Sequence, residues 1–281
     1  MPALKLDDRA LIEVRGPDAE SLLQGVLTPD LGTLAADEAR AGALLTPQGK
    51  ILFDFVISHT DDGFRLETDR SIAGDFVKRL TLYKLRAKAE ITPDTEAAVA
   101  VFWNEAPAGA LKDSRFGGDV AVYRSYAPDL AATDGSREDY DGLGISAGVA
   151  ESGRDFAVSD AFPHDVLFDL NGGVSFKKGC FVGQEVVSRM QHRGTARRRL
   201  AIAEAANPLP APGTAVEAGE RPVGALGTVV GNRALALVRT DRIADALASG
   251  QPVTAGGVAV TLSFPAWTGL SFERPAETAG R

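Results

Sequence analysis

Hydrophobic spacing over the first hundred residues predicts strands and helices in irregular alternation. Apolar residues from 10 to 14 predict a strand, and apolar residues at helical spacing between 18 and 27 predict a helix. Further strands are predicted at 41–45, 51–58, 64–67, 87–91 and 97–102, and an amphipathic helix at 71–85. This order is typical of an α+β fold rather than of a regular βαβ repeat.

Short strand-like segments separated by glycine turns dominate the C-terminal part. They lie at 199–203, 225–230, 234–238 and 258–264, with a short helix at 241–247. Such a pattern is typical of a small β-barrel. We therefore expect an α+β body over residues 1–195, a β-barrel over 197–270 and a tail over 271–281.

Composition places the chain among ordinary globular proteins. Hydrophobic residues make up 44% and charged residues 24% of its 281 residues, so the chain can build a core. Its apolar runs are too short to span a bilayer, and its first residues lack a secretory pattern. The single cysteine, Cys180, excludes an intramolecular disulfide and is typical of a reducing compartment. We expect a cytoplasmic protein with no membrane association.

The net charge of −8 argues against direct nucleic-acid binding as the main function. Two stretches depart from this balance. Residues 177–199 carry seven lysines and arginines with Glu185 as their one acid, and residues 76–89 carry five with no acid. These stretches are either local attractors of an anion or solvated faces, and the sequence leaves both interpretations open.

The lone cysteine lies in the segment 178–185, which reads Lys-Gly-Cys-Phe-Val-Gly-Gln-Glu. We expect a strand before it at 174–176, a glycine-hinged turn carrying Cys180, and a helix that starts near Gly183. Free amides at the start of that helix, together with Lys177 and Lys178, would favour the thiolate of Cys180.

The same segment offers groups that suit a heterocyclic ligand. Gly179 and Gly183 permit a close approach of the backbone to a ligand. Gln184 and Glu185 can hydrogen-bond a ring that bears amide and amine groups, such as a pterin.

Two other interpretations of Cys180 stay open at this point. A lone cysteine is commonly a small buried apolar residue. A nucleophilic thiol would need a base, and His164 and His192 are near in sequence without diagnostic spacing. One cysteine and three histidines, with His59 as the third, show no ligand-pair spacing, so no protein-only metal site is predicted.

Residues 178–185 resemble the K-G-C-[YF]-x-G-Q-E signature of the YgfZ-type proteins, whose mitochondrial relatives act in iron–sulfur assembly. All eight positions fit. The resemblance extends over about residues 8 to 200. It includes Gly16-Pro17-Asp18-Ala19, Leu23-Gln24-Gly25, Pro47-Gln48-Gly49-Lys50, the segment from Tyr83 to Ile91, and Arg189.

The YgfZ-type family is similar to the T-protein aminomethyltransferases. That likeness implies a folate-binding α+β body with a C-terminal β-barrel and tetrahydrofolate in a central cavity. Asp54 matches the essential aspartate of the T-proteins, although Phe53 replaces the first member of their Asp pair. Arg9 and Tyr140 stand where some relatives carry tryptophan, at the mouth of that cavity.

The resemblance and the basic stretches together predict the folate contacts. The pterin is expected near Gln184 and Glu185, and the glutamate tail near Lys84 and Arg86. The full predicted set of contacts is Lys178, Gly179, Gly183, Gln184, Glu185, Arg189, Gln24, Lys84 and Arg86.

The resemblance implies a tetrahydrofolate-binding accessory protein for iron–sulfur cluster assembly or repair, including the clusters of a tRNA-modifying enzyme. Its partners would be folate and iron–sulfur client or assembly proteins. Cys180 would ligate a transient iron–sulfur cluster, react with a one-carbon unit or sense oxidation. Classical enzymatic turnover stays open.

Two alternative functions are compatible with parts of the sequence. The first is a folate-dependent aminomethyl or methyl transferase, but glycine-cleavage T-proteins do not typically carry the Lys-Gly-Cys signature. The second is an RNA-binding module that uses the basic stretches. An RNP-type motif and an aromatic platform are both missing from those stretches, which argues against it.

Overall fold

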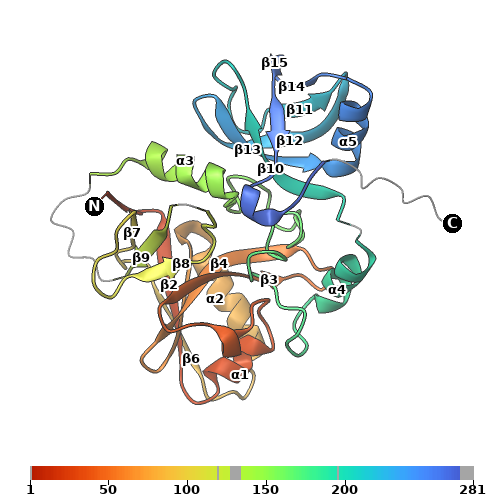
Figure 1. Cartoon of the computed structure of the whole chain (residues 1–281). Helices are drawn as coiled ribbons and strands as arrows, with labels where there is room; N and C mark the ends of the chain where they lie inside the picture. Colours follow the sequence, from red (N-terminus) through yellow and green to blue (C-terminus); the bar gives the residue numbers. More distant parts are fainter. Residues whose placement is uncertain (1, 119, 127–133, 195, 273–281) are drawn as a thin grey trace.

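The computed structural model describes residues 2–118, 120–126, 134–194 and 196–272, which form a larger lobe and a smaller β-barrel lobe (Figure 1). Nine strands of the larger lobe join in the order β1-β7-β9-β8-β3-β4-β5-β2-β6. The pair β3–β8 is parallel, and its neighbours in the sheet pair antiparallel. The strands are β1 (Ala3–Lys5), β2 (Arg9–Arg15), β3 (Glu38–Leu45), β4 (Ile51–Thr60), β5 (Gly63–Asp69), β6 (Glu90–Asp94), β7 (Ala100–Trp103), β8 (Leu111–Asp113) and β9 (Val122–Ser125).

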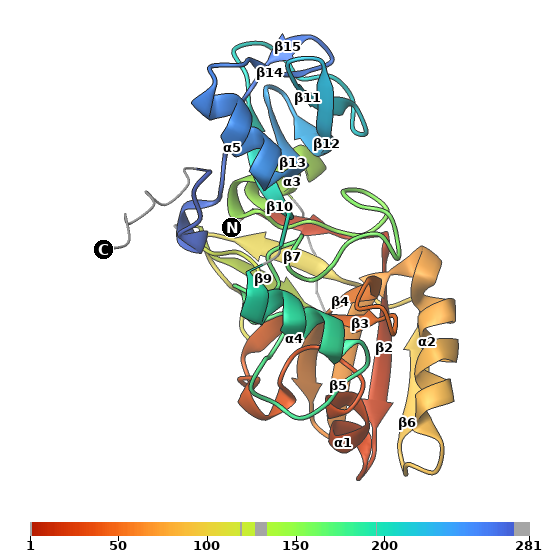
Figure 2. The same cartoon turned by 90° about the vertical axis from the view of Figure 1, so that its right-hand side faces the viewer.

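Helices α1 (Ala19–Gln24) and α2 (Arg70–Lys84) cover one face of this sheet (Figure 2). Phe53 and Phe55 of β4 point toward α2, where their ring centroids lie 4.8 and 5.5 Å from that of Phe76. Successive side chains of a strand point to opposite faces, so Asp54 between them points to the other face. The two faces of β4 therefore differ in character, one being a closed apolar core and the other polar around Asp54.

The other face of the sheet is covered by α3 (Arg137–Ala147) and by the segment 149–183 that follows it. Helix α3 begins with a capping box between Ser136 and Asp139, and its end is marked by Gly148 at φ +71°. The segment 149–183 carries no helix or strand, only an isolated bridge between Ser152 and Phe156.

The strand predicted at 174–176 is wrong. The Ser175 N–H donates to the Thr28 carbonyl at 2.9 Å, and the Thr28 hydroxyl donates to the Gly173 carbonyl at 2.6 Å. These single bonds to the loop after α1 hold the segment in place. The hydrophobic residues of this segment are buried against β3 and the neighbouring loop, but the segment forms no ladder of hydrogen bonds with another strand.

The β-barrel lobe is a seven-stranded sheet in the order β15-β14-β11-β12-β13-β10-β16. Its apolar face encloses a core of small and branched residues, including Ala201, Val216, Ala236 and Val253. The elements are β10 (Arg198–Glu204), β11 (Ala215–Ala218), β12 (Arg221–Val230), β13 (Arg233–Arg239), α5 (Thr240–Ala248), β14 (Val253–Ala255), β15 (Val258–Ala259) and β16 (Thr261–Ser263).

Packing across the two lobes is continuous. Ile145 of α3 shares one buried cluster with Leu200 and Leu235 of the barrel. The Asp155 carboxylate accepts hydrogen bonds from the Thr228 N–H and hydroxyl at 2.7 and 2.8 Å. Burial raises the pKa of Asp155, while these donors oppose the rise.

The chain leaves the barrel later than the predicted tail implies. Phe272 is buried, and its ring lies 4.2 Å from that of Phe264, because the barrel core needs a large apolar cover at this end. Residues 273–281 of the predicted tail lie outside the described residues. No helix in the described part of the chain is long and apolar enough to cross a membrane.

Candidate functional site

Residues 178–185 connect the segment 149–183 to helix α4 (Gln184–Arg193), which lies beside the β3–β4 turn (Figures 1 and 2). The helix starts next to Gly183, close to where the sequence predicts it. Cys180 is exposed on the connecting loop. Its exposure excludes the interpretation of Cys180 as a buried apolar side chain.

Lys178 anchors this loop. It is only 9% exposed, and its Nζ donates to the carbonyl oxygens of Leu27 and Pro29 at 2.7 and 2.8 Å. Burial lowers the pKa of Lys178 to about 8, and the carboxylate of Asp30 opposes this shift. The ammonium group of Lys178 is therefore bound to the loop after α1. It holds residues 178–183, which we call the cysteine loop, against that loop.

Gly183 allows the backbone at the other end of the loop to pack tightly against the β3–β4 turn. Its φ of +78° is unfavourable for other residues, and a Cβ here would lie 2.5 Å from the Thr46 carbonyl oxygen. Gly49 of the same turn faces α4, where its Cβ would lie 3.0 Å from Val186 Cβ. By contrast, a Cβ on Gly179 would meet no atom within 4 Å, so the space beside Cys180 is open.

The predicted pterin contacts lie on the surface of α4. Glu185 is exposed and pairs with Arg189 one turn later, at 2.7 Å. Gln184 is half-buried at the first helical position. Gln24 donates to Asp30 at 2.8 Å and accepts from the Leu31 N–H at 2.9 Å, so it stabilises the same loop that Lys178 grips.

A surface cavity of about 450 Å³ adjoins the segment that leads to Cys180. Its lining includes Asp30, Arg40, Phe176 and Lys177. The Arg40 guanidinium is already bound to Glu38, with Nε to Oε1 at 2.8 Å and a second contact at 2.6 Å. Lys177 is thus the cation that this cavity presents.

Among the described residues, neither His164 nor His192 forms a hydrogen bond with Cys180. His164 is buried, and its Nε2 forms a hydrogen bond with Gln191 Oε1 at 3.0 Å. Burial lowers the pKa of His164. His192 is exposed in the last turn of α4. Within residues 2–118, 120–126, 134–194 and 196–272, no three His, Cys, Asp or Glu side chains gather in a metal-binding group.

Folding pairs three of the seven cations of residues 177–199 with carboxylates. Arg198 pairs with Asp165 at 2.8 Å, and Arg199 binds both oxygens of Asp169 at 2.6 and 2.9 Å. Lys178 is held by carbonyl groups, and Arg189 pairs with Glu185. Carboxylates outside the stretch thus pair with Arg198 and Arg199, whereas among the described residues Lys177, Arg193 and Arg197 are exposed and form no ion pair.

Asp54 lies on the sheet face opposite to α2. Its carboxylate accepts a hydrogen bond from the Ser152 N–H at 3.1 Å and another from the Ser152 hydroxyl. Burial raises the pKa of Asp54, and the Ser152 donors oppose the rise. The neighbouring Glu151 carboxylate is occupied by the guanidinium of Arg9.

A buried ion network extends from this point through the centre of the larger lobe. Arg124 is fully buried and pairs with Glu67 and, at 2.7 Å, with Asp113. It also donates to the Tyr140 hydroxyl at 2.9 Å. Sequence reasoning singled out Arg9 and Tyr140 but missed the network, because its members are far apart in sequence on strands, on α3 and in the segment 149–183. Each looks like a solvent-facing charge until the strands pair.

The resemblance predicts tetrahydrofolate in a cavity whose mouth lies at Arg9 and Tyr140, and the network contains both of these residues. The cavity bordered by Tyr140, Glu151 and Asp155 measures about 20 Å³, enough for one water molecule. Sites for ligands of folate size are several hundred Å³. Arg9 and Glu151 form a buried ion pair close to Asp54, and a pterin ring bound at this carboxylate would have to displace that pair.

Lys84 and Arg86 lie far from that centre in the fold. They stand at the C-terminal end of α2, on the face of the sheet opposite to Asp54. The predicted folate contacts therefore fall in three places: the cysteine loop with α4, the polar centre around Asp54, and the end of α2. The structure does not bring them into one cavity.

Comparisons with known proteins confirm the fold and the resemblance. The mitochondrial iron–sulfur cluster assembly factor IBA57 of Homo sapiens is 32% identical over 300 residues, covering 94% of this chain and 84% of that protein. The tRNA-modifying protein YgfZ of Vibrio vulnificus is 30% identical over 249 residues, covering 78% of this chain and 74% of that protein.

Two further comparisons concern the architecture. Residues 197–270 match the C-terminal β-barrel domain of CAF17. The crystal structure of glycine cleavage system aminomethyltransferase T from Bartonella henselae matches with a TM-score of 0.71, covering 94% of this chain and 85% of that chain. At 17% sequence identity, this likeness shows the fold alone. It confirms the predicted α+β body with a C-terminal β-barrel.

Proposed function

Because the chain belongs to the family of the iron–sulfur cluster assembly factor IBA57 and of YgfZ, we propose that it assists the assembly or repair of iron–sulfur clusters in other proteins. The observation that carries this proposal is the exposed Cys180 on a loop anchored by the buried Lys178. The YgfZ relatives are named tRNA-modifying proteins, so we include a tRNA-modifying iron–sulfur enzyme among the clients.

The chemistry of the site supports a shared cluster. Iron–sulfur clusters are commonly held by four cysteine thiolates. This chain has one cysteine, so it can offer a single thiolate ligand while a client or carrier protein supplies the others. An exposed sulfur beside the open space at Gly179 suits a ligand that meets a cluster on another protein.

The proposal routes no step through tetrahydrofolate, since a pterin ring at Asp54 would have to displace the Arg9–Glu151 pair and the hydrogen bonds from Ser152. The same observation weighs against an aminomethyl transferase, because the matching carboxylate of Asp54 is held by Ser152. The net charge of −8 weighs against an RNA-binding module.

Complementation tests the role of Cys180. Cells that lack the native protein receive the wild type, Cys180→Ser, or Cys180→Ser combined with Ser249→Cys. The last variant controls for an exposed thiol elsewhere, because Ser249 is exposed on the barrel. We expect iron–sulfur enzyme activity to return with the wild type alone, while all three chains unfold at the same temperature.

Two results would overturn the proposal. Full recovery with Cys180→Ser would show that the thiol is dispensable. Recovery with the relocated thiol of Ser249→Cys would show that the anchored loop has no role in placing the sulfur.

A further inference from the structure

Helix α4 leads from the cysteine loop toward the barrel lobe and exposes one side of its surface (Figure 1). The exposed residues stand at positions i, i+4, i+7 and i+8, which share one side of a helix: Glu185, Arg189, His192 and Arg193. The outer stripe of α4 therefore starts beside the loop that carries Cys180 and ends near the junction of the two lobes.

Positive charge at both ends of this region has no carboxylate partner within the described part of the chain. Arg193 and Arg197 are exposed and form no ion pair there, and the same holds for Lys177 before the cysteine loop. In the middle of the stripe, Arg189 is paired with Glu185. In a chain of net charge −8, this surface is locally positive.

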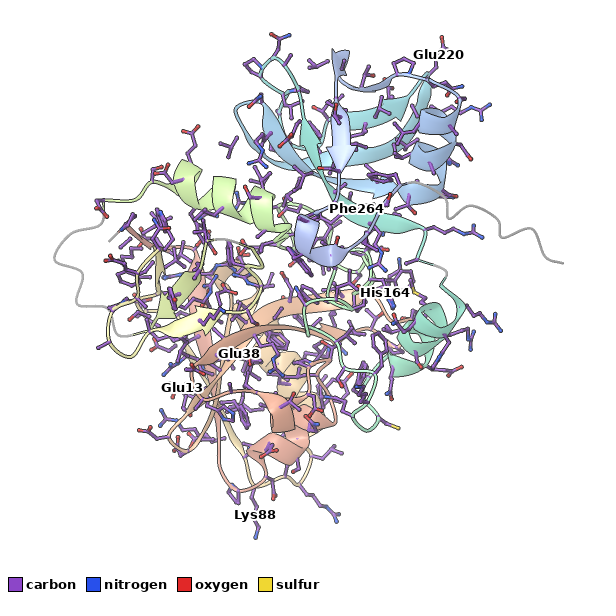
Figure 3. All side chains as sticks on the ribbon, viewed as in Figure 1. Glu13, Glu38, Lys88, His164, Glu220 and Phe264 are labelled. Carbon is purple, nitrogen blue, oxygen red and sulfur yellow. The ribbon has the colours of Figure 1, made fainter. Side chains whose placement is uncertain are left out.

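A pocket lies beside the two unpaired arginines, where α4 meets the barrel lobe. Its volume is about 220 Å³, and its walls are partly apolar, with Phe264 of the barrel lobe among them (Figure 3). Gly194, which follows Arg193, and Ala196, which precedes Arg197, also line it. The pocket is therefore a hollow large enough for a side chain of another protein, with two cations next to it.

The spacing along α4 suits a single protein interface. Ten residues make the helix about 15 Å long, with the cysteine loop at one end and Arg193 at the other. Stable interfaces bury about 800 Å² on each partner, which is a patch wider than this length. A protein that lies along α4 while its cluster reaches Cys180 would therefore also cover the arginines.

We propose that this surface is the docking site for a protein that carries an iron–sulfur cluster and presents carboxylates around an apolar side chain. We call it the α4 face and define it by Arg189, His192, Arg193, Arg197 and the pocket. The apolar side chain would enter the pocket, and the carboxylates would pair with the arginines, since cations covered without partners oppose binding. The inference rests on the proposed function, because a cluster shared with Cys180 brings its carrier to this side of the molecule.

The chemistry of the α4 face favours a protein over RNA and over a second copy of the chain. Bases of single-stranded RNA stack on aromatic rings, and helix α4 contains no Phe, Tyr or Trp. A symmetric contact between two copies would place the arginines of one copy against those of the other. An acidic protein surface meets neither difficulty.

Site-specific photo-crosslinking in cells identifies the partner. A benzophenone amino acid replaces His192, and the crosslinked protein is identified and purified. Calorimetry then measures its binding to the full chain as the wild type, as the double charge reversal Arg193→Glu/Arg197→Glu, and as Ala196→Phe, which fills the pocket.

The variant Arg79→Glu/Lys88→Glu is the matched control. It makes the same change in net charge at two exposed residues that form no ion pair within the described residues. Lys88 points into solvent at the end of the larger lobe opposite to the barrel, far from the α4 face (Figure 3). An effect of net charge alone would therefore appear in both double variants.

We expect Arg193→Glu/Arg197→Glu to weaken binding by about tenfold or more and to flatten its dependence on salt. Ala196→Phe should weaken binding with the salt dependence retained, because the charges stay in place. The control variant should bind as the wild type does, and all of these chains should unfold at the same temperature. Lysines in place of the partner's carboxylates should restore its affinity for the double charge reversal.

Four results would overturn the docking surface. These are the absence of a crosslinked protein, a crosslink to RNA, a crosslink to a second copy of the chain, and a protein that binds the wild type and Arg193→Glu/Arg197→Glu equally well.

Complementation separates this inference from the proposed function. If Cys180→Ser fails to restore iron–sulfur enzyme activity while Arg193→Glu/Arg197→Glu restores it fully, the thiol keeps its role and the docking surface is overturned. Recovery with Cys180→Ser overturns the proposed function itself.

Discussion

The ammonium group of Lys178 lies 2.7 Å from the carbonyl oxygen of Leu27, 151 residues earlier in the chain. This contact joins the cysteine loop to the chain just after α1, and Lys178 donates a second hydrogen bond to the Pro29 carbonyl. A signature lysine that the sequence presents as a ligand contact or an activator of the thiol is, in the fold, a buried clamp. Its effect on Cys180 is exerted through the position of the loop.

Replacing Lys178 by methionine tests the clamp. The apolar stem is kept, but the carbonyl groups of Leu27 and Pro29 lose their donor, so the free energy of unfolding should fall by about 1–3 kcal/mol. Lys177→Met is the control, since Lys177 is exposed, and should change stability by less than about 0.5 kcal/mol. Urea unfolding measures both, and equal stability of the two variants would contradict a clamp at Lys178.

The stability of the wild type should depend on pH through the same lysine. Burial lowers the pKa of Lys178 from 10.5 to about 8, so between these values the unfolded chain binds more protons than the folded one. Stability from this group therefore rises as the pH goes from about 8 to 10.5. The difference between wild type and Lys178→Met should grow in favour of the wild type over that window. A difference that stays flat from pH 7 to 10.5 would argue against a buried ammonium.

Gly183 and Gly179 should respond in opposite ways to alanine. A Cβ at Gly183 meets the Thr46 carbonyl oxygen at 2.5 Å in a left-handed backbone, so Gly183→Ala should destabilise the protein by about 2 kcal/mol or more. Gly179→Ala adds a methyl group to open space and should stay within about 0.5 kcal/mol of the wild type. Thermal unfolding distinguishes them. If Gly179→Ala folds normally but loses complementation, the open space is needed by the partner.

Titration with tetrahydrofolate tests whether the buried ion pair near Asp54 excludes this ligand. The pterin ring would have to separate Arg9 from Glu151, and the separated charges would be buried without partners. We expect no saturable binding by calorimetry at micromolar protein and ligand. Saturable one-to-one binding that Asp54→Asn abolishes would show that the ion pair opens for the ligand. Binding that Asp54→Asn leaves unchanged would place the ligand elsewhere.

The spacing of hydrophobic residues and glycines along the chain determined much of the fold of this protein. The helix predicted at 71–85 is α2 (Arg70–Lys84), because its apolar residues recur at helical spacing and one stripe faces a sheet. The strand predicted at 51–58 lies within β4 (Ile51–Thr60), and the C-terminal barrel follows from short strands between glycine turns. The signature at 178–185 pointed to the family on its own, because six of its eight positions are fixed and a seventh allows only tyrosine or phenylalanine.

Only the tertiary structure decided what the charged residues do. A sequence records that Arg9, Glu67, Arg124 and Glu151 are charged, but not that strand pairing buries them against one another. Alternation along β4 places Asp54 and the α2 end on opposite faces, which separates contacts that the sequence assigned to one cavity. Partners such as Leu27 for Lys178 lie more than a hundred residues away in the chain. A sequence also does not show which backbone carbonyl groups will accept a hydrogen bond from a side chain. Long-range packing therefore determines the roles of these charges.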